Sequence, residues 1–127
     1  MKFLSWQIDN ARPIYPQLME KIELEIIAGT YPPGGRLPSV RELAMLANVN
    51  PNTMQKALSE LERLDLLHTE RTSGRFITND TKRIADLRQS LAEEEIRKFT
   101  AKMASLQYDR EETLSLLNKI NKEHTNG

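Results

Sequence analysis

The chain has 127 residues, which is enough for one domain or for a small domain with an appendage. It contains no cysteine, so disulfides, thiolate metal sites and cysteine nucleophiles are excluded. No apolar run approaches the roughly 20 residues of a membrane-spanning helix, and residues 1–6 lack the pattern of a signal peptide, so we expect no membrane association and a cytoplasmic location. The formal net charge is zero, which argues mildly against nucleic-acid binding unless the basic residues gather on one face.

Three helices are predicted in the first half of the chain. The first covers residues 13–29, because apolar residues recur at helical spacing, at Ile14, Leu18, Ile22 and Ile26. The second covers residues 40–47, where Ser39 is the N-cap and Glu42 completes a capping box. The third runs from Pro51 to about residue 65, with Asn50 as its N-cap.

The second half begins with a short hairpin and continues as helix. Residues 67–71 and 75–78 have β-like composition around a turn that contains Gly74. A polar break at residues 78–81 is followed by a long helix over residues 82–106 and a last helix from Asp109, which with Glu112 forms a capping pattern. The predicted fold is therefore mainly α with a small β-hairpin, divided into a domain at residues 7–78 and a helical region at residues 79–124.

The second and third helices have the spacing of a helix-turn-helix. Ala44 is the small residue required where the helices cross, and Asn48 tolerates the left-handed backbone of the turn. Such a turn leaves the start of the third helix projecting, so that it can enter a major groove. The alternative is an ordinary helical hairpin in which Asn50 is only a cap.

The side chains around this turn carry amides, a hydroxyl and positive charge, which suit base edges and phosphates. A two-stranded wing directly after such a helix strengthens the interpretation. Glycine at its tip permits close approach to DNA, and arginines there can hold phosphate or enter a minor groove. The alternative is a plain exposed hairpin. The predicted DNA-binding residues are Arg41, Asn50, Asn52, Thr53, Gln55, Lys56, Arg71, Gly74 and Arg75.

The two C-terminal helices indicate self-association, because two helices cannot bury both of their apolar stripes alone. A second copy of the chain would cover them across a two-fold interface; the alternative is packing on helix 13–29. The stripe steps irregularly from Leu91 to Ile96, which favours a short helical bundle over a long coiled coil. The predicted dimerisation residues are Ile84, Leu87, Leu91, Phe99, Met103, Leu114 and Leu117.

An enzyme is the main alternative class, but no catalytic set is found. His68 and His124 are isolated and have no partner at metal-ligand spacing. We therefore expect no metal site, no cofactor and no enzymatic activity, and the residues do not identify a small-molecule effector. A further alternative is a protein-interaction adaptor, in which the winged helix binds protein instead of specific DNA.

Several ordered motifs resemble the GntR family of regulators. Residues 13–18 resemble the family's P-I-Y-x-Q-L opening, residues 33–44 its P-G-x-x-L-P-S-x-R-x-L-A signature, and residues 49–53 its V-N-P-N-T recognition-helix start. Three positions depart from the pattern. Asp65 replaces a usual glycine, the wing has lost one of its two glycines, and Pro51 stands where many relatives have a contacting arginine.

The resemblance implies a bacterial transcriptional regulator, usually a repressor. It implies DNA contacts from Gly74 at the wing tip and from Arg41, Asn50, Asn52, Thr53 and Gln55. Fewer than fifty residues follow the wing, which is similar to the YtrA-type subfamily with its two-helix dimerisation tail. Such regulators bind double-stranded operator DNA and often control transporter operons, including their own gene. Two recognition helices about 34 Å apart in a homodimer would read a palindrome.

Overall fold

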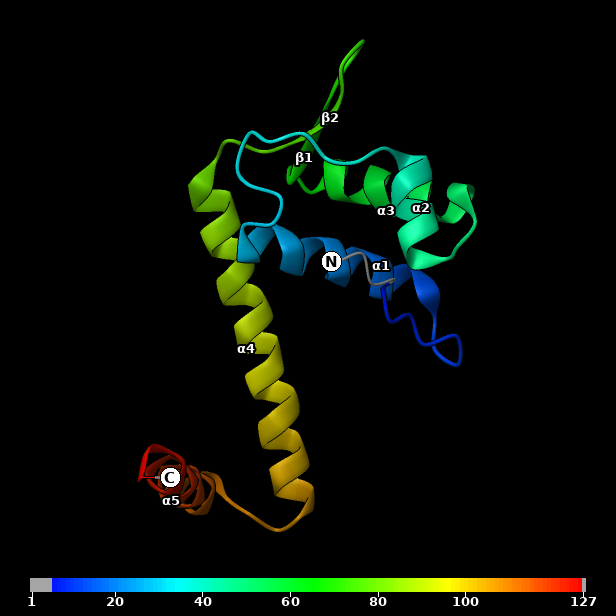
Figure 1. The fold of residues 1–127 in the computed structure, drawn as a ribbon. Coiled ribbons are helices and arrows are strands. Elements are labelled where there is room, and N and C mark those ends of the chain that lie inside the picture. The colour runs from blue at the N-terminus through cyan, green and yellow to red at the C-terminus, as the bar shows by residue number, and fades with distance from the viewer. Residues whose placement is uncertain (1–5, 127) are drawn as a thin grey trace. The chain divides into compact units, whose positions relative to one another are not determined.

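The computed structural model describes residues 6–126. The prediction that the chain starts without a signal peptide concerns residues 1–6, of which residues 1–5 lie outside the described part. The described elements are α1 (Ile14–Ala28), α2 (Val40–Ala47), α3 (Pro51–Arg63), β1 (Leu67–Glu70), β2 (Gly74–Ile77), α4 (Thr81–Ser105) and α5 (Arg110–Asn126) (Figure 1). They confirm the predicted mainly helical fold with one hairpin. The chain forms two compact units, one up to Arg88 and one from Gln89 on.

Helices α1, α2 and α3 build the core of the first unit. The predicted stripe of α1 is buried, with Leu18 and Ile22 fully covered, and α1 packs against α3. Gly29 ends α1 in the left-handed conformation, with φ +86°. From α3, the core receives Met54, Ala57, Leu58 and Leu61. The opposite face of α3 is consequently left to solvent.

The predicted helix-turn-helix is confirmed in its details. The Ser39 hydroxyl accepts from the backbone N–H of Glu42 while the Glu42 carboxylate accepts from that of Ser39, so the capping box is complete. Asn48 ends α2 with φ +56°, the left-handed geometry for which asparagine is suited. The Asn50 side chain caps α3 by accepting from the Asn52 N–H at 2.7 Å.

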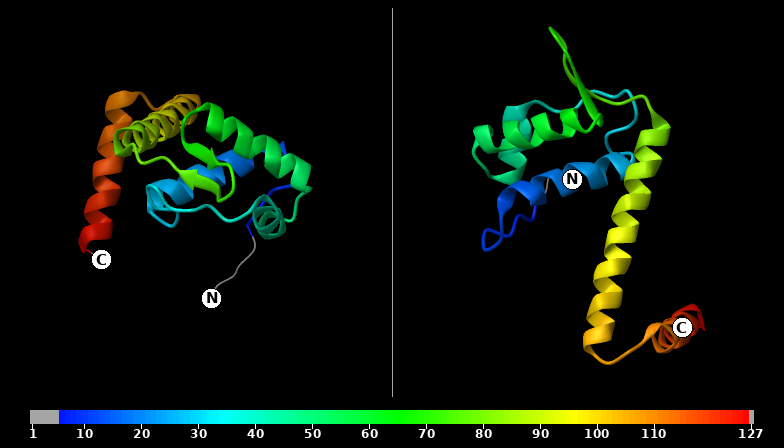
Figure 2. Two further views of the ribbon diagram at one scale, coloured as in Figure 1. Left: turned by 90° about the horizontal axis from the view of Figure 1, so that it is seen from above. Right: turned by 180° about the vertical axis from the view of Figure 1, so that it is seen from behind.

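The hairpin is a two-stranded wing, and an isolated β-bridge between Arg36 and Phe76, which the sequence did not predict, adds to it. β1 and β2 are antiparallel, and they project beyond the three helices (Figure 2). On the other edge of β2, the Leu37 N–H donates to the carbonyl oxygen of Arg75 at 2.9 Å, and the Ile77 N–H donates to that of Gly35 at 2.8 Å. The segment before α2 therefore joins the wing to the helix-turn-helix.

The first turns of α4 belong to the first unit. Arg83 Nε donates to the carbonyl oxygen of Leu64 at 3.0 Å, which fastens α4 to the end of α3. Leu87 is only 6% exposed, and Ile84 is half-buried. Both were predicted to meet a second subunit. Leu87 is instead already covered by its own chain, so it has little surface left for a partner.

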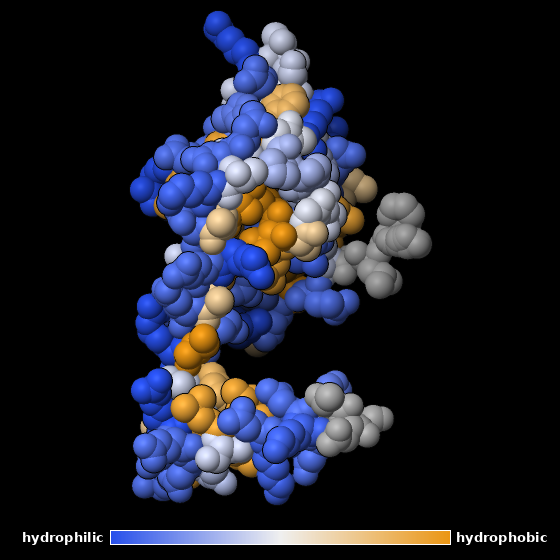
Figure 3. All heavy atoms as spheres, turned by 90° about the vertical axis from the view of Figure 1, so that its left-hand side faces the viewer, coloured by the Kyte–Doolittle hydropathy of each residue, from blue (hydrophilic) through white to orange (hydrophobic). Residues whose placement is uncertain are grey.

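The second unit consists of the rest of α4 and α5. Asp109 and Glu112 form the predicted capping arrangement, each accepting from the other's backbone N–H. Leu91 and Met103 are half-buried, whereas large apolar side chains remain 42–61% exposed, at Ile96, Phe99, Leu114, Leu117 and Ile120. Figure 3 shows hydrophobic side chains at the surface of this unit.

None of the helices in the described part of the chain has both the length and the apolar character of a membrane-spanning helix.

Candidate nucleic-acid interface

The exposed face of α3 carries most of the polar residues predicted to read bases. Asn52, Gln55 and Lys56 are exposed, and Thr53 is half-buried, while the other face of the helix lies in the core. Gln55 makes a long hydrogen bond of 3.4 Å to the Ser59 hydroxyl, which a base edge can replace. Asn52, Gln55 and Lys56 are therefore available to a ligand that meets α3 on its outer side.

Asn50 differs from these residues, because its side chain already has a structural function. Its Oδ1 accepts the Asn52 N–H at the helix start, so only its amide N–H groups remain for a base or phosphate. Asn50 is therefore a helix cap, as the alternative interpretation of this residue has it. A contact between Asn50 and DNA stays a prediction.

The basic side chains of residues 7–78 are divided into those that make an ion pair and those that make none. Residues 7–78 contain eight Lys or Arg and nine Asp or Glu, so the segment as a whole has no basic surplus. Four of the basic residues are bound to carboxylates, in the pairs Arg12–Asp9, Lys21–Glu25, Arg63–Glu60 and Arg75–Glu62. The other four make no ion pair within the described part of the chain; these are Arg36, Arg41, Lys56 and Arg71. All four lie between the β-bridge at Arg36 and the turn of the wing.

A groove of ≈ 670 Å³ runs between the start of α2 and the wing. Residues 36–40, 42 and 69–75 line it, so the predicted wing residues Arg71 and Gly74 share it with the first turn of α2. The Glu42 carboxylate in this groove is held by the capping box. Its hydrogen bonds with Ser39 lower the pKa of Glu42, and the charge of Arg36 adds to that effect. The Glu42 carboxylate is therefore held in its ionised form, and it contributes a negative charge to the groove.

Arg75 was predicted to contact DNA, but the structure directs its side chain to α3. Arg75 Nε donates to Glu62 Oε1 at 2.9 Å, and the Thr69 hydroxyl donates to Glu62 Oε2 at 2.8 Å. Burial raises the pKa of Glu62, but these two hydrogen bonds and the Arg75 charge outweigh it and leave the pKa below its usual value. Glu62 therefore clamps both wing strands onto the end of α3, and Arg71 remains as the exposed arginine of the turn.

Sequence reasoning missed two residues of this region, Glu62 and Arg36. Glu62 is separated from Arg75 by thirteen positions and Arg36 from Gly74 by more, so no helical or strand periodicity links either pair. For Arg36 the available signal was the motif at residues 33–44, and a motif does not show what a side chain contacts.

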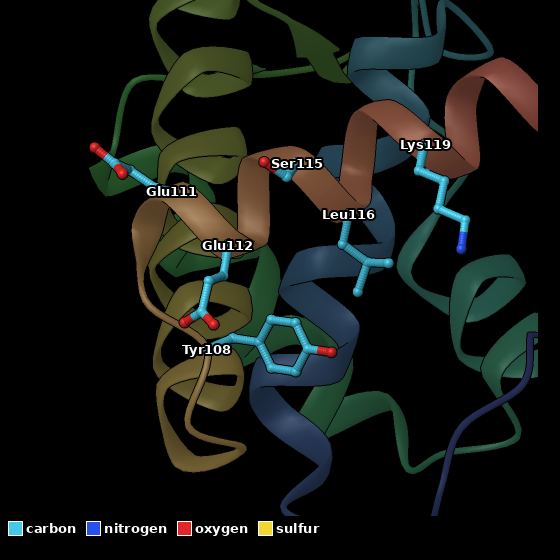
Figure 4. Close-up of a pocket in the computed structure, with 6 residues that line it drawn as sticks. All are labelled: Tyr108, Glu111, Glu112, Ser115, Leu116 and Lys119. Atoms are coloured by element: carbon cyan, nitrogen blue, oxygen red, sulfur yellow. The ribbon is translucent and has the colours of Figure 1, made fainter.

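A further hollow lies on the second unit. It lies along the start of α5 and is lined by Tyr108, Glu111, Glu112, Ser115, Leu116 and Lys119 (Figure 4). Glu111 turns away from the other side chains in the figure, and Glu112 is engaged in its cap. Within residues 6–124, no group of three His, Asp or Glu side chains could hold a metal ion.

The sequence and the fold match known regulators. The profile of the family "Bacterial regulatory proteins, gntR family" matches residues 14–77. The chain is 37% identical over 108 residues to the uncharacterized HTH-type transcriptional regulator YhcF of Bacillus subtilis, covering 85% of this chain and 89% of YhcF. It is 42% identical over 78 residues to the HTH-type transcriptional repressor YtrA of the same organism, covering 60% of each.

The fold of this chain also matches that of a solved regulator over most of its length. A GntR family transcriptional regulator from Listeria monocytogenes superposes with a TM-score of 0.82 at 38% identity, covering 88% of this chain and 98% of that one. These relatives are transcriptional regulators and not enzymes, and the similarity to YtrA agrees with the predicted subfamily. The chain therefore belongs to the GntR family of bacterial regulatory proteins.

Proposed function

We propose that this transcriptional regulator is a sequence-specific DNA-binding repressor that binds a palindromic operator as a homodimer. One observation carries the proposal. Four basic side chains of residues 7–78 have no carboxylate partner, and all four lie on the helix-turn-helix, on the wing or on the segment that joins them; these are Arg36, Arg41, Lys56 and Arg71. Unpaired Lys and Arg are the groups that bind phosphates, and exposed amides on the same helix suit base edges.

A homodimer is supported by the apolar surface of the second unit. Ile96, Phe99, Leu114, Leu117 and Ile120 are between 42% and 61% exposed. Burying apolar surface stabilises an interface by roughly 25 cal/mol per Å² before the costs of association. A second copy of the chain carries the same surface, so a two-fold interface would cover both.

The gene target follows only from the relatives. YtrA is named a transcriptional repressor, and by the resemblance we propose control of a transporter operon that includes the regulator's own gene. Since the target would be chromosomal DNA, we expect the protein in the bacterial cytoplasm.

The test is a selection of duplexes from a random DNA library by the purified protein, followed by fluorescence anisotropy at several salt concentrations. We expect salt-sensitive binding that favours the selected duplex over a random duplex of equal length. Enrichment of a palindrome would support the homodimer. Absence of binding even at low salt would overturn the proposal in favour of the protein-interaction adaptor.

Two variants test the residues. Arg41→Ala and Asn52→Ala should weaken binding to the selected duplex by about 1–3 kcal/mol, or 5- to 150-fold, for each of the two half-sites that the proposed homodimer contacts. Asn52→Ala should also reduce the preference over the random duplex. Lys122→Gln, on the exposed surface of α5, is the control for loss of one positive charge. Circular dichroism should show that each variant is folded, and unchanged affinity of both would refute the assignment.

A further inference from the structure

Arg36 lies in the segment before α2, where it forms an isolated β-bridge with the outer edge of the wing. Hydrogen bonds from the Leu37 N–H to Arg75 and from the Ile77 N–H to Gly35 place Arg36 opposite Phe76 in an antiparallel bridge. Residues opposite each other in such a pair share a face with their diagonal neighbours two positions along. Arg36 therefore shares a face with Gly74, and its side chain runs along the wing toward the turn.

Gly74 lies directly against the Arg36 guanidinium. A Cβ at position 74 would lie 3.2 Å from Arg36 Nε and 3.4 Å from Arg36 Nη2, closer than most carbon contacts in proteins. Gly74 also has φ +111°, which disfavours any other residue. The absence of a side chain at Gly74 thus leaves room for Arg36 beside the wing, in addition to the close approach to DNA that we expect of this glycine.

The charge of Arg36 is not neutralised by a carboxylate of its own. Among the described residues it makes no ion pair, and Glu42, whose pKa it lowers, already accepts a hydrogen bond from the Ser39 backbone. Glu70, which also lines the groove, lies 3.5 Å from His68 Nε2. The groove is lined by three arginines, Arg36, Arg71 and Arg75, and by two carboxylates, Glu42 and Glu70, so its lining carries one more positive than negative charge.

We propose that Arg36 is a DNA-binding residue that holds a backbone phosphate in the groove between the wing and α2, and that Gly74 serves to admit its side chain there. A planar guanidinium suits phosphate oxygens because it can donate two parallel hydrogen bonds. A phosphate contact fixes the position of the duplex and carries no sequence information. The inference rests on the proposed function, since it requires a duplex in this groove.

The first experiment measures the salt dependence of affinity for a random duplex and for a duplex selected by the wild-type protein. Each phosphate contact contributes about 0.9 to the slope of log K against log salt. Arg36→Gln should reduce the slope by about twice that amount on both duplexes, because the proposed homodimer carries two copies of Arg36. Arg36→Lys should retain most of it, and the control Lys122→Gln should leave it unchanged.

The second experiment measures the coupling between Arg36 and Gly74. Gly74→Ala strains the backbone in any background, but it should displace the guanidinium only where Arg36 is present. We expect Gly74→Ala to weaken binding at least several-fold more in the wild type than in the Arg36→Gln variant, with thermal melting confirming that each variant is folded. Equal losses in both backgrounds would overturn the role of Gly74.

The outcomes separate this inference from the proposed function. If the wild type binds neither duplex at low salt, the proposed function fails and this inference fails with it. If the wild type binds with a steep salt dependence and Arg36→Gln keeps the full slope, only the assignment of Arg36 is overturned.

Discussion

Glu62 should hold the wing in place, so removing its charge should destabilise the protein and weaken DNA binding together. Charged hydrogen bonds stabilise proteins by about 1.5–3 kcal/mol each. The side chains of Arg75 and Glu62 are 17% and 29% exposed, so solvent screens their pair only in part. Glu62→Gln keeps the shape of the side chain and one acceptor oxygen. We therefore expect it to lower the free energy of unfolding by about 1 kcal/mol, below the full value for a charged pair.

The assay is urea unfolding followed by circular dichroism, with Glu60→Gln as the matched control. Glu60 lies two residues before Glu62 on α3 and pairs with Arg63, whose side chain is 68% exposed. Such surface pairs contribute little to stability, because solvent screens them. If Glu62→Gln costs no more than Glu60→Gln, or if the effects of Glu62→Gln and Arg75→Gln are additive, the clamp is refuted.

The same residue predicts an effect of pH. Because the folded state lowers the pKa of Glu62, its contribution is complete above the pKa of an unfolded glutamate, about 4.3, and is lost as pH falls through the lower folded value. Glu62→Gln should therefore reduce the acid dependence of stability, and it should weaken operator affinity at neutral pH because the wing is no longer held against α3.

Three further predictions concern the rest of the chain. Phe99→Glu or Leu117→Glu should dissociate the proposed homodimer, since each puts a charge on the exposed apolar surface of the second unit. Light scattering coupled to gel filtration measures the mass, and a dimer that persists in both variants would contradict the prediction. Asp65 has φ +63°, so Asp65→Gly should raise the free energy of unfolding by about 0.5–1 kcal/mol, and a decrease in urea unfolding would show that the strain is already compensated. Burial and the charge of Glu20 raise the pKa of Glu23, and the charge of Arg83 opposes this only in part, so Glu23→Gln should stabilise the protein at neutral pH. The gain in stability should shrink as pH falls through the raised folded pKa of Glu23. A gain that does not depend on pH would refute the prediction.

Much of the fold could be predicted because the determining signals are local. The capping box at Ser39 and Glu42, the left-handed Asn48 and the cap at Asn50 depend on residues within three positions of each other. The buried stripes of α1 and α3 follow from helical periodicity alone. These features also identified which face of α3 is exposed, and hence the candidates Asn52, Gln55 and Lys56.

Only the tertiary structure decided which charges are available and which apolar residues are covered. Arg75 and Arg71 flank the same short turn and look alike in the sequence, yet Glu62 binds the first and leaves the second exposed. Leu87 belongs to the same stripe as Leu91, yet it is buried in the first unit. Ion pairs and packing between distant segments depend on where the backbone brings them together, and local propensity carries no information on that placement.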